Sequence, residues 1–409
     1  MQSTRVVTPV FVTLVASALC NFVAMGMVAP VLPRHIEDDL GGGPLHVGIV
    51  VGAYAVAAAA SRPAIGALGD RRGRRPLIVG GMVVAALSIL GYGAAPVIVA
   101  LVAMRFVTGL GEAAVFVGTH TAAQDLGPPH RRGEAATFFS ISVWGGMAIG
   151  PPLGDLLSTT VGPGAVWPAA AAVVALGSAI GLLLPRELGR HPVEVAAAPA
   201  APRAGRPAAV HWRHRLMHPA ATWPGFMLFC NLTSSNGFSA FIPLVAHDRG
   251  GRAGPLLFLY AATVLSTRLA WRRWPDRAGP ARVATVSLAL TATAGLLLAW
   301  APTYGALFAG TFVLGLGAAF LMPTMLTVTV ARAPDGERSR AMSSASLWLD
   351  MSQGLGAPLL GLVAVAAGTE QAAFAAAAVL ALAGLVVGRT RLEPEPEPGA
   401  RPAAAGAGA

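Results

Sequence analysis

Four ionisable residues stand within stretches of the sequence that are otherwise apolar: Arg105, Glu112, Asp155 and Asp350. A charge in apolar surroundings is costly, and residues of this kind commonly lie on the path of an ion or a polar ligand. Burial favours the neutral form of a carboxyl group, so an acidic residue at such a position can take up and release a proton. We therefore predict that these four residues take part in proton transfer.

The four positions differ in what else they could do. Seven residues separate Arg105 from Glu112, which is two helical turns and about 10 Å along the axis, so we expect no direct pair between them. Asp155 stands near the end of its stretch, where a hydrated position is an equally good interpretation. Asp350 could also anchor a cationic ligand.

A cluster of hydrogen-bonding side chains interrupts another apolar stretch, since five of the six residues from Asn231 to Asn236 carry an amide or a hydroxyl group. Such groups do not face lipid, so they indicate a water-filled cavity or a broken helix. Two tryptophans lie well inside their stretches, where they could offer aromatic surface to a bulky ligand. The candidate cavity residues are Asn21, Trp144, Asn231, Ser235, Asn236, Trp348 and Gln353.

Motifs typical of enzymes are missing from the sequence. It contains no nucleotide-binding loop of the form Gly-x4-Gly-Lys-Ser/Thr, and no His or Cys cluster has metal-ligand spacing. The only two cysteines, Cys20 and Cys230, lie in apolar stretches, which argues against a disulfide framework. We predict that the protein is not an enzyme and uses no metal and no cofactor.

The elements that must position these residues follow from composition. Hydrophobic residues make up 55% of the 409 residues and charged residues only 12%, against about 25% charged in a soluble domain. The apolar stretches have the length of helix that crosses a bilayer. Twelve spans are predicted, at 8–32, 45–67, 76–94, 96–119, 134–157, 165–185, 220–245, 254–271, 282–300, 303–330, 340–367 and 371–388. The fold class is therefore an all-α membrane protein.

The basic residues predict the orientation in the membrane. All 29 are arginines, and only Arg34, Arg249 and Arg252 fall in segments on the side opposite to the two termini. The excess of arginine on one side indicates that both termini lie in the cytoplasm. Because the arginines are scattered over many short segments, they favour a bacterial inner-membrane protein and not a nucleic-acid partner.

The two halves of the chain repeat one another. A shift of 206 residues places Arg62, Asp70, Arg71 and Gly73 on Arg268, Asp276, Arg277 and Gly279. A shift of 204 places Trp144 on Trp348, and one of 210 places Asn21 on Asn231. Internal duplication is typical of secondary transporters.

The duplication also sets the domain boundaries. We predict an N-terminal six-helix bundle at 1–186, a cytoplasmic linker at 187–218 rich in Pro, Ala and Arg, a C-terminal six-helix bundle at 219–389, and a disordered cytoplasmic tail at 390–409.

The ionisable residues break this symmetry. The equivalents of Arg105, Glu112 and Asp350 are Thr311, Ala318 and Gly146. We expect the residues that the halves share to serve the scaffold, and the charges that only one half carries to serve the function.

The segment after the second span reads Gly66-Ala-Leu-Gly-Asp70-Arg71-Arg-Gly73-Arg74-Arg-Pro. It resembles the signature that major facilitator superfamily transporters carry between spans two and three, with Gly69 as the one departure from the commonest Ala or Ser. The resemblance predicts a conformational latch formed by Gly66, Asp70, Arg71, Gly73 and Arg74. A tight turn with a positive membrane anchor is the simpler interpretation.

Two further motifs support the same resemblance. Arg105-x3-Gly109-x-Gly111 is similar to the superfamily's signature in its fourth helix. Gly146, Gly150, Pro151 and Gly154 resemble the Gly-Pro signature of exporters, and their spacing of four residues places a small-residue stripe on one helix face. We predict that this helix acts as a gate.

The resemblance implies the major facilitator fold, with two pseudo-symmetric bundles of six helices around a cavity that opens alternately to each side. Together with the buried carboxylates it favours proton-coupled efflux, by antiport, of a drug-like small molecule or secondary metabolite, driven by the proton gradient alone. The alternatives are export of a specific metabolite or sugar, or uptake by proton symport. The implied partners are a small-molecule substrate and the lipid bilayer, and the implied oligomeric state is a monomer.

Overall fold

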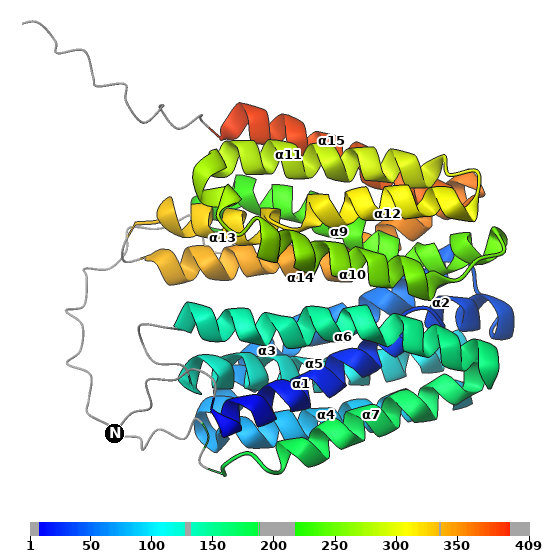
Figure 1. Cartoon of the computed structure of the whole chain (residues 1–409), viewed down its shortest axis with the longest axis vertical. Coiled ribbons are helices and arrows are strands. Elements are labelled where there is room, and N and C mark those ends of the chain that lie inside the picture. The colour runs from blue at the N-terminus through cyan, green and yellow to red at the C-terminus, as the bar shows by residue number, and fades with distance from the viewer. Residues whose placement is uncertain (1–7, 127–131, 187, 189–216, 335–336, 393–409) are drawn as a thin grey trace, which may run out of the picture.

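The computed structural model describes residues 8–126, 132–186, 188, 217–334 and 337–392, and these residues form helices and no strands. Figure 1 shows two stacked bundles whose helices run nearly side by side. The first holds α1 (Pro9–Val28), α2 (Leu32–Arg34), α3 (Pro44–Arg72), α4 (Arg74–Leu90), α5 (Ile98–Leu126), α6 (Arg132–Thr160) and α7 (Val166–Gly181). The second holds α9 (Pro219–Asp248), α10 (Ala253–Ala270), α11 (Trp274–Ala299), α12 (Tyr304–Ala318), α13 (Leu321–Ala331), α14 (Arg338–Ala367) and α15 (Gln371–Arg391).

Ten of the twelve predicted spans are long and apolar enough to cross a membrane within the described part of the chain. The other two are α6 and α9, with 29 and 30 residues. Their length is sufficient, but prolines and glycines in α6 and the cluster from Asn231 to Asn236 in α9 lower their hydropathy. The all-α membrane fold is confirmed, while the count of twelve remains a prediction for these two helices.

The helix contacts repeat between the two bundles. In the first, α1 packs on α6 and α7, and α5 packs on α3 and α4. In the second, α9 packs on α14 and α15, and α12 packs on α10 and α11. The repeat extends to the backbone, because the equivalent glycines Gly73 and Gly279 both have positive φ, 87° and 74°. Each allows a sharp turn that a side chain would strain.

The two bundles meet along two equivalent interfaces, α3 against α14 and α10 against α6. We call the end of the molecule that carries Arg186 and Pro219 the linker end, and the opposite end the distal end. A Cβ on Gly48 of α3 would lie 2.6 Å from the carbonyl oxygen of Ala357 in α14. A Cβ on the equivalent Gly254 of α10 would lie 2.8 Å from the Cβ of Asp155 in α6. The bundles are therefore in close contact at the distal end.

The predicted span 303–330 is broken into α12 and α13. Pro323 lacks an N–H group and cannot donate to the carbonyl of Ala319, four residues earlier. Nε of Arg268 donates to this carbonyl oxygen instead, at 2.7 Å. The break therefore arises from one proline and leaves a backbone acceptor for a side chain on another helix.

The small-residue stripe on α6 packs against α1 of the same bundle. Side chains on Gly146, Gly150 or Gly154 would collide with the α1 backbone at Phe22, Val23 and Met27 respectively. The predicted close packing is thus present, and the stripe leaves the neighbouring face of α6, with Asp155, toward α10. The predicted linker and tail lie almost entirely outside the described residues.

Candidate functional site

Glu112 lies inside the first bundle, where α5 faces α1. Its side chain is almost completely buried, at 3% exposure, and Nδ2 of Asn21 donates to its Oε2 at 3.0 Å. Oε1 of Glu112 and Oδ1 of Asn21 are buried without a hydrogen-bond partner in the described part of the chain. A carboxyl group with one unused oxygen can accept a proton or a water molecule there.

Arg105 lies one helical face along from Glu112, and no ion pair joins the two residues, as the spacing predicts. Its guanidinium carbon lies 4.9 Å from the ring centre of Tyr54 and 5.9 Å from that of Tyr92. The hydroxyl of Tyr92 contacts Oγ1 of Thr108 at 2.5 Å. Arg105 is therefore held in place by aromatic rings, an arrangement that stabilises a cation out of water.

The second bundle keeps the frame of this site without its charges. Nδ2 of Asn231 donates to Oγ1 of Thr291 at 2.8 Å and approaches the carbonyl oxygen of Gly317 at 3.4 Å. Thr311, the equivalent of Arg105, is fully buried. The residue that replaces Glu112 is Ala318, and the asparagine turns to the neighbouring backbone. The predicted asymmetry is present in three dimensions.

An ion pair joins the two bundles across the interface of α3 and α14. It links Nη1 of Arg62 to Oδ1 of Asp350, and the side chains are 32% and 15% exposed. Charged partners in a partly buried position attract one another more strongly than at a surface. Asp350, predicted as a proton site, is thus a contact between the halves.

An arginine also lies at the equivalent place in the second interface, that of α10 and α6. The guanidinium carbon of Arg268 lies 5.0 Å from the ring centre of Trp144. The same indole ring lies 6.4 Å from the ring of Tyr260. Trp144 is therefore the predicted cavity residue that lies between the bundles and next to a charge.

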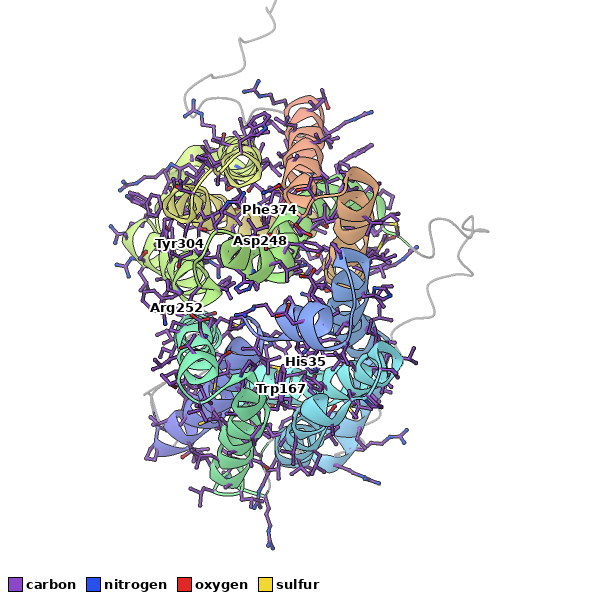
Figure 2. The ribbon with its side chains drawn as sticks, turned by 90° about the vertical axis from the view of Figure 1, so that its right-hand side faces the viewer. His35, Trp167, Asp248, Arg252, Tyr304 and Phe374 are labelled. Atoms are coloured by element: carbon purple, nitrogen blue, oxygen red, sulfur yellow. The ribbon has the colours of Figure 1, made fainter. Side chains whose placement is uncertain are left out.

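Asp155 joins the same two helices at the distal end. Its Oδ2 lies 4.0 Å from Nε of Arg252, and the backbone amide of Gly254 donates to the same carboxylate. The carboxylate therefore lies at the N-terminus of α10, where a helix dipole favours a negative charge. Figure 2 views this end of the molecule, with Arg252 at the boundary between the bundles. Asp155 is 7% exposed, so it is buried and paired rather than hydrated.

The other predicted cavity residues lie mostly inside the second bundle. Nδ2 of Asn236 donates to the carbonyl oxygen of Ser352 at 3.2 Å, and Oγ of Ser235 donates to that of Asn231 at 3.3 Å. Trp348 packs on Phe226 and Phe229 of α9, with ring centres 6.1 and 6.0 Å away. Gln353 is half-buried. In this conformation these groups hold α9 and α14 together, and contact with a substrate stays a prediction.

The predicted latch forms the junction of α3 and α4. Nε of Arg74 pairs with Oδ2 of Asp125 on α5 at 3.6 Å, and its backbone amide donates to the carbonyl oxygen of Leu188 at 2.9 Å. Arg71 is exposed, Gly66 is half-buried, and the side chain of Asp70 lies outside the described residues. The contacts of Arg74 are all with its own bundle's segments.

Sequence reasoning missed Arg62, Arg268 and Arg252 as site residues. Arg62 and Arg268 carried a signal, since both are charges in apolar stretches at equivalent positions, but they were interpreted as markers of the repeat. Arg252 carried no such signal, because its role depends on which helix meets α6.

Comparison with known proteins gives a single family. The profile of the Major Facilitator Superfamily matches residues 14–266 and 225–409. An uncharacterized MFS-type transporter of Salmonella typhimurium is 29% identical over 388 residues, which span 91% of this chain and 94% of that protein. One from Burkholderia pseudomallei is 28% identical, over 92% of this chain and 90% of that protein.

Solved structures agree in fold. A peptide transporter, POT, in complex with sulfate has a TM-score of 0.73 at 16% identity and 93% coverage of both chains. A bacterial homologue of the human lysosomal transporter Spinster has a TM-score of 0.72 at 16% identity, covering 93% of this chain and 95% of that one. At these identities the likeness concerns the fold alone.

Proposed function

The chain belongs to the Major Facilitator Superfamily of membrane transporters, and on that premise we propose that it exports a drug-like small molecule or secondary metabolite in exchange for protons. The proton gradient drives the exchange, without a bound cofactor. The transporter works as a monomer in the bacterial inner membrane, with both termini in the cytoplasm. A protease site added after Leu392 should then be cut in everted vesicles and spared in intact cells.

The observation that carries the proposal is the ion pair between Arg62 and Asp350, because it joins a protonatable group to the contact between the halves. Protonation of Asp350 removes the charge that attracts Arg62. A buried pair that loses one charge becomes unfavourable, since the other charge is left without compensation. Proton uptake therefore weakens one of the two interfaces on which alternating access depends.

Glu112 supplies a second proton site. It is buried next to α1, and its Oε1 has no partner among the described residues. Arg105 lies on the same helix without pairing with it, so its positive charge acts on Glu112 from a distance. We propose that Glu112 and Asp350 are ionised when the substrate binds and protonated when the empty transporter returns.

The distal contacts supply the gate. Asp155 binds the N-terminus of α10, and Gly48 and Gly254 bring the helix backbones together at the same end. With the distal end closed, the substrate enters from the linker end, which the arginine distribution assigns to the cytoplasm. We propose that Arg74 exchanges Asp125 for a contact with the second bundle when the distal end opens, which makes the junction of α3 and α4 a latch.

Efflux from everted vesicles tests the proposal. Vesicles that contain the wild type should accumulate fluorescent transported compounds when a pH gradient, acid inside, is imposed. Glu112→Gln and Asp350→Asn keep the shape of each side chain and remove its titration, so each should lower gradient-driven accumulation at least about tenfold, a loss of roughly 1.4 kcal/mol in coupling. Asp248→Asn, at an exposed acidic residue of the distal end, is the matched control and should leave it unchanged.

Retention of full gradient-driven accumulation by both variants would show that neither carboxylate carries the coupled proton. Accumulation by the wild type that is insensitive to the gradient would show that export is not coupled to protons at all.

A further inference from the structure

We propose that Arg268 is the anchor for a carboxylate group on the transported molecule, which makes the substrate an organic anion with an aromatic or apolar body. The inference rests on the proposed function, since it names the class of molecule that the exporter carries. It depends on the pairing, the position and the surroundings of this one guanidinium group.

The pairing of Arg268 is incomplete. Its equivalent, Arg62, is neutralised by Asp350, but the residue equivalent to Asp350 on α6 is Gly146, which packs against Phe22 of α1. In the described part of the chain Arg268 forms no ion pair. The duplicated frame therefore presents two arginines between the halves and a carboxylate for only one of them.

The position of Arg268 leaves donors free. Only Nε is used, by the carbonyl oxygen of Ala319 that Pro323 releases from the helix. The face of the guanidinium lies against the indole of Trp144. A guanidinium that stacks by its face and is held through Nε keeps the N–H groups at its edge, which match the two oxygens of a carboxylate.

Aromatic side chains surround the free edge. The ring of Trp144 lies 6.4 Å from that of Tyr260, which in turn lies 5.4 Å from that of Phe238. These residues come from α6, α10 and α9, so they span both halves of the molecule. A cation beside an aromatic surface favours a ligand with a negative group and a planar apolar body.

The same comparison argues against a cationic substrate. Asp350 is the acidic residue at the interface of the two bundles near their middle, and Arg62 already offsets its charge. An incoming cation would have to displace a guanidinium, whereas an anion meets unused donors at Arg268. The sequence-based interpretation of Asp350 as an anchor for a cation is therefore the weaker one.

Three probes of one shape test the charge preference directly: 2-naphthoate, 2-naphthamide and 2-naphthamidine, which are negative, neutral and positive. Binding is measured by the rise in melting temperature of the purified, detergent-solubilised full chain. We expect naphthoate to bind the wild type at least about tenfold more tightly than the other two. Arg268→Gln should remove this preference, and Arg268→Lys should keep part of it.

Arg272→Gln, at an exposed arginine just beyond α10, is the matched control and should bind naphthoate like the wild type. Equal affinities across the three probes, unchanged naphthoate binding in Arg268→Gln, or no stabilisation by naphthoate would each overturn the inference. Because this assay does not involve the proton gradient, naphthoate binding that depends on Arg268 would stand even if the carboxylate variants of Glu112 and Asp350 transported normally.

Discussion

Asn21 and Asn231 occupy equivalent places in the two bundles, yet their amide groups bind different acceptors. Asn21 donates to the carboxylate of Glu112, and Asn231 donates to the hydroxyl of Thr291. The first contact involves an ionisable group and the second does not. A change at the two positions should therefore separate a contribution to proton binding from a contribution to stability.

Leucine has nearly the shape of asparagine but cannot donate a hydrogen bond. Asn231→Leu should lower stability by about 0.6 kcal/mol, the usual contribution of such a contact in a membrane, and leave the pH profile of transport unchanged. Asn21→Leu should cost a similar amount and also move the pH at which transport is half-maximal, because it removes the donor to Glu112. Both profiles are measured as initial rates in proteoliposomes between pH 5 and 9; a profile for Asn21→Leu that coincides with that of Asn231→Leu would contradict the proposed role of Glu112.

The broken symmetry of the repeat was enough to select Glu112 and Asp350 from the sequence. The partners of these residues could not be predicted in the same way. Arg62 meets Asp350 only because α3 packs on α14, 288 residues apart in the chain. A residue's chemistry is local in sequence, whereas its partner depends on the packing of helices.

Among the helices, the distal closure depends on glycine. Gly254 of α10 lies against Pro151 and Asp155 of α6, and a Cβ there would lie 3.1 Å from the carbonyl oxygen of Pro151. Overpacking of such a contact costs about 1–3 kcal/mol. This free energy is large enough to change the ratio of two conformations by roughly 5- to 150-fold.

Gly254→Leu should therefore shift the transporter toward a conformation that is open at the distal end. The distance between spin labels at Val161→Cys and Trp300→Cys, both on exposed positions at that end, measures the shift in a background without Cys20 and Cys230. We expect a longer component in the variant, and no change in the control Gly164→Leu, where a side chain meets open space. An unchanged distance in Gly254→Leu would show that this contact does not hold the gate closed.

Hydropathy predicts the lengths of helices better than their continuity. It indicated one span from 303 to 330, but the lost hydrogen bond at Pro323 divides it into α12 and α13. The same proline stands in an apolar segment of ordinary composition, so no average over the segment would reveal the break. Its consequence, a free carbonyl for Arg268, is visible only once α10 is placed beside it.

At the scale of the whole molecule, two equivalent interfaces join two equivalent bundles, and each contains an arginine at the same place in the repeat (Figure 1). The duplication could be predicted from the sequence, and with it the fold. The closed distal end could not, because a transporter's sequence encodes both of its conformations and favours one only by a small difference in free energy.

Exchange of substrate for protons is the central claim, and opposed fluxes in one preparation test it most directly. The wild type is reconstituted into liposomes that contain a pH-sensitive dye and no pH gradient, and a concentration gradient of a transported compound is imposed from outside. Our account predicts that inward movement of the compound drives protons outward, so the interior becomes more alkaline. Acidification of the interior would indicate symport, and a constant pH during measurable uptake would indicate uncoupled transport; either result would contradict antiport.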